Sequence, residues 1–176
     1  TVRAFDLRTR RQLLCFSGHK GPVLSLDWAA SGLALSGGRG GIAIAWDLQA
    51  GGPVGMLKGH KGHVTVVRWL QQSRSGGSGS SSGEASVFMT GAQDGHVRIW
   101  DLRSRGEIAN ISAHTSQRGA GAIAGIEVSA SGNTIVSAGA DRAVCMLDVR
   151  AGFKLRHRAT DHKDFIYELK TVGENA

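Results

Sequence analysis

The sequence is poor in cysteine and proline and has no long apolar run, and each shortage excludes a class of protein. Two cysteines among 176 residues, Cys15 and Cys145, are too few for a secreted disulfide framework. They fit a reducing compartment as two small buried thiols. No stretch approaches the ~18 consecutive apolar residues of a spanning helix, so we expect no membrane insertion. We expect an intracellular protein, cytoplasmic rather than nuclear.

Acidic residues are the minority charge. The chain has 21 Lys and Arg against 14 Asp and Glu, which gives a formal net charge of +7. A basic balance permits an acidic partner such as a protein surface or nucleic acid, but it does not identify one. The basic residues are scattered along the chain rather than clustered, so charge alone does not define a function.

A short pattern recurs along the chain. The pairs that open the units are Gly18-His19, Gly59-His60, Ala113-His114 and Asp161-His162. The pairs that close them are Trp46-Asp47, Trp100-Asp101 and Leu147-Asp148. Successive opening histidines are 41, 54 and 48 residues apart. The chain therefore contains three units, and a fourth begins near its C-terminus.

Each unit alternates short apolar runs with turn residues. In the second unit the runs cover residues 64–69, 87–90, 97–100 and 108–111, and they are rich in β-branched and aromatic side chains. Such runs are typical of strands, and the Asp94-Gly95 pair between two of them predicts a hairpin. No stretch has the apolar spacing of a helix. The sequence therefore predicts an all-β fold with four antiparallel strands in each unit.

The Gly-His openings and Trp-Asp closings at this period resemble the WD-repeat β-propeller family. The resemblance implies a partial propeller over residues 1–176, with complete blades at approximately 22–57, 63–111 and 123–158. Because such propellers usually close with about seven blades, we expect an internal part of a larger ring. A four-bladed ring, in which the two ends of the chain join, remains the alternative.

Partial blades are expected at both ends of the chain. The front of the chain supplies two strands, near residues 2–6 and 12–16, and residues 165–170 supply one first strand. Residues 71–86 interrupt the second unit with a Gly/Ser-rich stretch. This stretch has no apolar residues to bury, and we expect it to be a flexible loop.

The family resemblance also implies a structural network in each blade that joins a His, a Ser or Thr, an Asp and a Trp by hydrogen bonds. The second unit has all four: His60, Thr90, Asp94 and Trp100. The first unit has His19, Ser36 and Trp46, with Gly40 at the Asp position; the third has His114, Ser137 and Asp141, with Leu147 at the Trp position. We expect those two networks to be incomplete, and we expect Gly40→Asp to be neutral or stabilising.

We expect a non-enzymatic scaffold or adaptor that binds a partner protein, one with an acidic segment, through its loops. The candidate partner-binding face comprises Lys20, Arg39, Lys61, His63, Arg118, Arg142 and Lys163. The alternative is a subunit of a ribonucleoprotein or nucleic-acid-associated complex that uses its basic surface. The His60 and His63 pair lacks further ligands, so we expect no metal. We likewise expect no catalytic residues, no cofactor and no small-molecule substrate.

Overall fold

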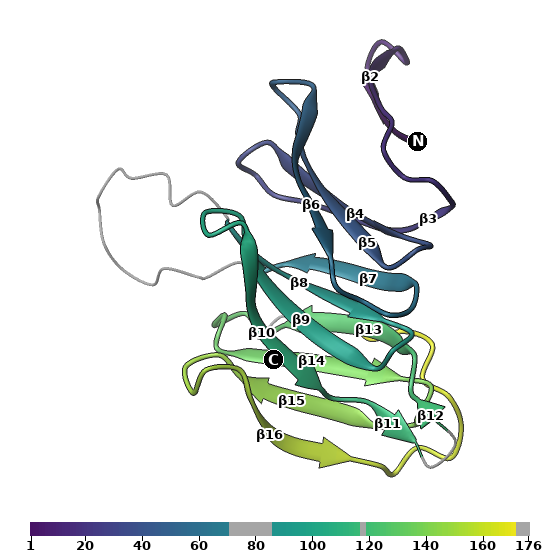
Figure 1. Ribbon diagram of the computed structural model, residues 1–176, viewed down its shortest axis with the longest axis vertical. Coiled ribbons are helices and arrows are strands. Elements are labelled where there is room, and N and C mark those ends of the chain that lie inside the picture. The colour runs from purple at the N-terminus through teal and green to yellow at the C-terminus, as the bar shows by residue number, and fades with distance from the viewer. Residues whose placement is uncertain (71–85, 117–118, 172–176) are drawn as a thin grey trace.

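The computed structural model describes residues 1–70, 86–116 and 119–171. Strands β1 (Val2–Phe5) and β2 (Gln12–Phe16) form a two-stranded sheet. Three four-stranded antiparallel sheets follow along the chain, and Figure 1 shows them fanned out in sequence order. The all-β fold and the four-stranded units predicted from the sequence are confirmed. Of the expected loop 71–86, all but Ser86 lies outside the described residues.

Each four-stranded sheet pairs its strands in chain order. The first sheet contains β3 (Val23–Trp28), β4 (Leu33–Gly38), β5 (Ile42–Asp47) and β6 (Gly52–Lys58). The second contains β7 (Val64–Trp69), β8 (Val87–Ala92), β9 (His96–Asp101) and β10 (Gly106–Ser112). The third contains β13 (Ile123–Val128), β14 (Thr134–Gly139), β15 (Val144–Asp148) and β16 (Lys154–Ala159). The short strands β11 (Thr115–Ser116) and β12 (Gly119–Ala120) pair with each other between the second and third sheets.

Successive sheets pack face to face, and we call each such contact a seam. The seam between the first and second sheets buries Leu35, Val67 and Trp69, among other side chains. The seam between the second and third sheets buries Ile99 and Ile126 in the same way. These apolar side chains alternate along their strands with residues on the other face, so the second sheet contributes to both seams.

The first strands of neighbouring sheets are linked by side-chain hydrogen bonds. The backbone N–H of Val67 in β7 donates to Ser25 Oγ in β3 at 3.1 Å. Thr65 Oγ1 in β7 donates to the carbonyl oxygen of Ile123 in β13 at 2.6 Å. These bonds provide hydrogen-bond partners for some of the polar groups that lie between the first strands. The sheets are therefore held in register where their first strands converge.

Glycines at the seams allow the sheets to approach closely. A Cβ on Gly37 would lie 2.6 Å from Val64 Cγ1, and one on Gly91 would lie 2.7 Å from Ile123 Cγ2. The third sheet has Ala138 at the equivalent position, and this side chain is fully buried. The first two seams therefore require a residue without a side chain at this point of the second strand.

Two expectations about the fold are wrong. Residues 165–170 form no strand, although they run beside β13, where Leu169 approaches Gly125. A first strand pairs with the second strand of its own sheet, and no second strand follows among the described residues. Cys145 is buried as expected, but Cys15 is exposed, because it alternates along β2 with Leu14 and Phe16, which pack against the first sheet. No helix in the described part of the chain is long and apolar enough to cross a membrane.

Candidate partner-binding face

The candidate residues come from turns and connections that meet at one edge of the sheets. We call this the loop edge; it comprises residues 17–22, 39–41, 59–63, 93–95, 113–116, 119–122 and 140–142. Arg39 N–H donates to the carbonyl of Pro22 at 3.0 Å, and Gln93 N–H donates to that of His63 at 2.9 Å. Since each hairpin turn is bonded to the connection that enters its own sheet, the turns are held in fixed positions.

The structure brings most of the predicted residues to this edge. Lys20, Arg39, Lys61 and Arg142 are exposed there, and His63 is half-buried. Lys163 is exposed in the segment that follows β16, whose last residue pairs with Val144 beside the loop edge. Arg118 lies outside the described residues. The loop edge therefore exposes basic side chains, as binding of an acidic partner segment would require.

The carboxylates of the turns do not neutralise this edge, because they are bound inward. Asp94 accepts from His60 Nδ1 at 3.0 Å and from the backbone N–H of Lys61 at 2.8 Å. Asp141, whose side chain is only 1% exposed, pairs with His114 and Arg158. Among the described residues, the side chains of Lys20, Arg39, Lys61, Arg142 and Lys163 form no ion pair. Their charge remains available to a partner, with Asp161 and Asp164 as exposed acidic neighbours of Lys163.

The second sheet contains the complete hydrogen-bonded chain beneath this edge. Trp100 Nε1–H donates to Thr90 Oγ1 at 2.8 Å, and the Thr90 hydroxyl lies 2.7 Å from His60 Nε2. With Nδ1–H of His60 donated to Asp94, the Thr90 hydroxyl donates to Nε2, and every member has a partner. Burial lowers the pKa of His60 against the opposing effect of Asp94. The imidazole is therefore neutral at neutral pH.

The carboxyl group of Asp94 is held ionised by its partners. Burial alone would raise its pKa, but the N–H of Lys61 and the side chain of His60 outweigh burial and lower it. The pair of His60 and Asp94 is thus a hydrogen bond from a neutral ring to a carboxylate. Because Lys61 donates its backbone N–H to the same carboxylate, the network fixes the backbone from which the Lys61 side chain projects.

The first sheet has a shorter chain of bonds. His19 Nε2 lies 2.7 Å from Ser36 Oγ, which also accepts from Trp46 Nε1 at 2.8 Å. Gly40 has a φ of +96°, and no atom lies within 4 Å of the position of a Cβ on it. An L side chain is strained at that φ, whereas Asp94 and Asp141 at the equivalent positions do not have positive φ. The expectation that Gly40→Asp is neutral or stabilising is therefore wrong.

The third sheet replaces the missing tryptophan by a different arrangement. His114 Nδ1 donates to Asp141 Oδ1 at 2.8 Å, and His114 Nε2 lies 2.8 Å from Ser137 Oγ. Leu147 fills the Trp position and is fully buried. Arg158 Nη2 donates to Asp141 Oδ2 at 2.7 Å and to the carbonyl of Thr115 at 2.9 Å. Burial lowers the pKa of His114, as does Arg158, while Asp141 opposes this shift.

The sequence did not predict the role of Arg158. The equivalent positions in the other two sheets are Met56 and Asn110, so the repeat pattern assigns no function to this place. A basic residue at a position that varies between units was the only available signal. Its guanidinium now ties β16 to the connection that carries β11, and it thereby supports the loop edge of the third sheet.

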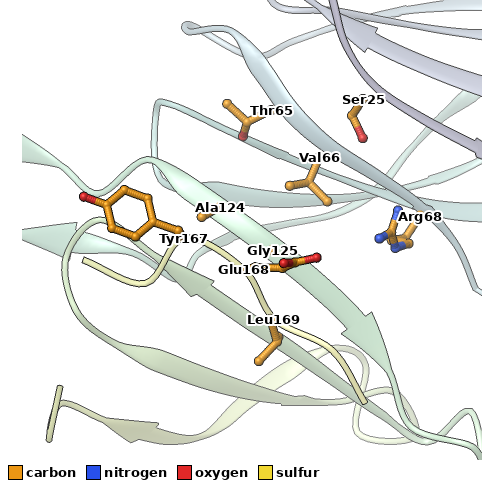
Figure 2. A pocket seen from close by; sticks show the side chains of 9 residues that line it. All are labelled: Ser25, Thr65, Val66, Arg68, Ala124, Gly125, Tyr167, Glu168 and Leu169. Atoms are coloured by element: carbon orange, nitrogen blue, oxygen red, sulfur yellow. The ribbon is translucent and has the colours of Figure 1, made fainter. Parts of the chain in front are cut away.

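A pocket of about 350 Å³ lies where the first strands converge. Figure 2 shows Thr65, Val66 and Arg68 of β7 across from Tyr167 and its neighbours in the C-terminal segment. Arg68 donates to Glu127 at 3.3 Å, so its charge is partly satisfied. A second pocket of about 500 Å³ lies beside it, and Asp27, Arg68 and Glu127 contribute to its walls. Within the described residues no group of three or more His, Cys, Asp or Glu could hold a metal ion.

Four-stranded antiparallel sheets that pack face to face in chain order, with their first strands innermost, are the blades of a β-propeller. The family model described as "WD domain, G-beta repeat" matches residues 10–47 and 51–101, about half of the chain. The chain therefore belongs to the WD-repeat family. Domains of this family are typically non-catalytic and generally act as protein-interaction scaffolds.

Two curated relatives are similar over most of the chain. The DENN domain and WD repeat-containing protein SCD1 of Arabidopsis thaliana is 30% identical over 178 residues, which cover 99% of this chain. Cell division cycle 20.4, cofactor of APC complex, from the same plant, is 30% identical over 139 residues, which cover 78% of this chain. The chain spans 13% and 27% of the lengths of these two relatives.

A solved structure shows the same fold. The computationally designed Ika8 protein matches 98% of this chain and 47% of its own chain, with a TM-score of 0.78. The sequence identity is 23%, so the likeness concerns the fold alone. The match extends the propeller arrangement to the third sheet, which the family model does not cover.

Proposed function

We propose that the chain is an adaptor whose loop edge binds an acidic segment of a partner protein. The observation that carries this proposal is the difference in exposure between the basic and the acidic side chains at this edge. Lys20, Arg39, Lys61 and Arg142 are exposed, while Asp94 and Asp141 are engaged by the chain itself. An acidic segment would therefore meet positive charge without first displacing an internal carboxylate.

The rigidity of the edge supports the same proposal. The backbone of Lys61 is bonded to Asp94, and the backbone of Arg39 is bonded to Pro22. Side chains that project from fixed turns lose less entropy on binding than those on a mobile loop. The relative whose name describes it as a cofactor of the APC complex supports an adaptor role, because that name describes a protein acting within an assembly.

The test compares two charge reversals. Lys61→Glu with Arg142→Glu changes the loop edge, and Arg8→Glu with Arg103→Glu changes the turns at the other edge of the sheets. With a fluorescent oligo-glutamate peptide as the probe, we expect the first pair to weaken binding about tenfold or more, chiefly through slower association. Neither pair should change the urea midpoint appreciably, because all four residues are exposed.

Equal effects of the two pairs, or an effect of the second pair alone, would contradict the assignment of the face. Nucleic acid is the second candidate, since a net charge of +7 also attracts phosphate. Titration with single-stranded RNA at several salt concentrations separates the two. Tighter binding of RNA than of the peptide, with a steep salt dependence, would favour the ribonucleoprotein role.

We also propose an intracellular, cytoplasmic location. Burial raises the pKa of the Cys145 thiol to about 11, so it stays protonated and unreactive. Cys15 is exposed and unpaired. An exposed thiol of this kind persists in a reducing compartment, whereas outside the cell it would oxidise or pair with another thiol. Localisation of a fluorescent fusion of the chain, with labelling of Cys15 in cell lysate, tests this placement.

A further inference from the structure

The hairpin turn of the first sheet lacks the carboxylate that the turns of the other two sheets carry. Gly40 stands at the position of Asp94 and Asp141. In the second sheet, Asp94 accepts from Nδ1 of His60 at 3.0 Å and from the backbone N–H of Lys61 at 2.8 Å. The second sheet therefore shows which donors a carboxylate meets at this position.

The first sheet keeps the framework around this position. His19 Nε2 lies 2.7 Å from Ser36 Oγ, as His60 Nε2 lies 2.7 Å from Thr90 Oγ1. In both sheets a backbone N–H of the turn donates to a carbonyl of the connection that carries the histidine, at 3.0 Å in the first sheet and 2.9 Å in the second. The connection and the turn of the first sheet are therefore held together by the same bonds as in the second.

The proton of the His19 ring lies on Nδ1. Ser36 Oγ accepts from Trp46 Nε1–H at 2.8 Å. Its own proton can go to His19 Nε2 at 2.7 Å or to the carbonyl of Ile44 at 3.5 Å, and the shorter bond is the better one. Nδ1 lies beside the turn, since a Cβ on Gly38 would be 2.9 Å from it. The ring therefore presents an N–H donor to the turn.

Two of the donors that hold Asp94 have unused equivalents in the first sheet. Within the part of the chain that the structure describes, neither His19 Nδ1 nor the backbone N–H of Lys20 has a hydrogen-bond partner. A third donor to Asp94, the N–H of His96, corresponds to that of Ile42, which belongs to the strand ladder of its own sheet. The first sheet thus keeps two donors for a carboxylate that it does not supply.

The position is open to solvent and positively charged. Gly40 is exposed, and no atom lies within 4 Å of the position of a Cβ on it. The side chains of Lys20 and Arg39 flank it, are exposed and form no ion pair among the described residues. Two N–H donors between two cations favour a carboxylate as the ligand. All of these groups belong to the first sheet and the connection that enters it.

We propose that this position, which we call the Gly40 site, binds one carboxylate of an Asp or Glu side chain in the partner's acidic segment. It rests on the proposed function and adds one fixed contact point within the loop edge. The carboxylate accepts from His19 Nδ1–H and from the backbone N–H of Lys20, as Asp94 accepts from their equivalents. Lys20 and Arg39 attract the remainder of the segment. Donors that are already held in position bind with a smaller loss of entropy.

Acetate reproduces the side chain that Gly40 lacks, so it is the smallest probe of the site. NMR spectra of the backbone amides are recorded during titration with sodium acetate, and with sodium chloride at equal ionic strength. We expect acetate alone to shift the Lys20 amide proton downfield to a plateau. The Lys61 amide is the internal control, because it is already bonded to Asp94. No shift at Lys20, or a shift of equal size at Lys61, would overturn the proposal.

A neutral obstruction tests the site with the fluorescent oligo-glutamate peptide. Gly40→Ala places a methyl group in the approach to the two donors. We expect it to weaken binding about tenfold, as the loss of a hydrogen bond to a charged group does. Circular dichroism checks that the variant folds.

Gly152→Ala is the matched control for this variant. Gly152 has a φ of +73°, no atom lies near the position of its Cβ, and it belongs to the turn between β15 and β16 at the other edge of the sheets. The control therefore has a similar backbone cost but should leave binding of the peptide unchanged. Equal affinities of the two variants would contradict the Gly40 site.

The outcomes separate this site from the proposed function. If Lys61→Glu with Arg142→Glu weakens binding of the peptide and Gly40→Ala does not, the loop edge attracts the segment by charge alone and the Gly40 site is wrong. If acetate shifts the Lys20 amide and Gly40→Ala weakens binding, but the charge reversal has no effect, the Gly40 site is supported and the wider binding surface is wrong.

Discussion

Arg158 Nη2 lies 2.7 Å from Asp141 Oδ2 and joins β16 to the turn between β14 and β15. The carboxylate it meets also accepts from His114 and is almost fully buried. This sheet has Leu147 where the other two have tryptophan. Arg158 therefore adds a charged contact to the one network of the described sheets that has lost its aromatic donor.

Removal of Arg158 should destabilise the chain. Arg158→Met leaves the buried Asp141 with fewer donors, and we expect a loss of about 1–3 kcal/mol in the free energy of unfolding. Arg156→Met is the control, since the Arg156 side chain is 64% exposed and pairs with Asp148 at the surface. The control should cost less than about 1 kcal/mol. Urea denaturation of both variants measures the difference, and equal losses would show that the buried contact adds nothing.

The complete network of the second sheet should be sensitive to truncation. Trp100→Ala leaves a cavity and removes a donor to Thr90, so we expect a loss of about 2–4 kcal/mol. Asp94→Ala should cost a similar amount, because His60 and the N–H of Lys61 lose their acceptor. Gln49→Ala changes an exposed side chain and serves as the control. Thermal or urea unfolding measures all three, and uniformly small losses would show that the network contributes little.

Two glycines with positive φ should respond differently to alanine. Gly95 has a φ of +77°, and a Cβ there would overlap the carbonyl oxygen of His114. Gly40 has a φ of +96°, with no atom near its Cβ position. Gly40→Ala should therefore cost about 1 kcal/mol for the backbone alone, and Gly95→Ala should cost clearly more. Similar urea midpoints for the two variants would mean that the close approach of Gly95 to the His114 carbonyl does not limit the side chain at this position.

Stability should decrease as the solution becomes acidic. Burial lowers the pKa of His60 and His114, so the folded chain binds fewer protons than the unfolded chain below about pH 6.5. The free energy of unfolding therefore falls as pH drops from that value through the lowered pKa values. The carboxyl group of Asp94, whose pKa is also lowered, adds a further loss below its ordinary value of 3.8.

Urea midpoints at about pH 7.5 and pH 5.5 measure this dependence. His114→Gln should reduce the difference between the two midpoints, because the titrating group is gone. His157→Gln is the control, since His157 is exposed on β16. A wild-type midpoint that is unchanged or higher at the lower pH would contradict the assignment of neutral, buried histidines.

The repeat pattern predicted the strands because each unit encodes its own local structure. Short β-branched runs separated by turn residues determine a four-stranded sheet without long-range information. The resemblance to the WD-repeat family implied the contacts among His60, Thr90, Asp94 and Trp100, and the structure contains them. The strand predicted at residues 165–170 did not form, since no second strand follows it within the described residues to pair with it.

The sequence by itself determined the strands of the three four-stranded sheets and the turns that connect them, because both depend on local patterns and short-range pairing. The tertiary structure decided backbone conformation, long-range contacts and burial. It placed Gly40 in a left-handed conformation that disfavours aspartate, and it brought Arg158 onto Asp141. It also left Trp28 exposed and Trp69 buried at equivalent positions. Burial depends on which surface packs against a residue, and the sequence of a single repeat does not specify that surface.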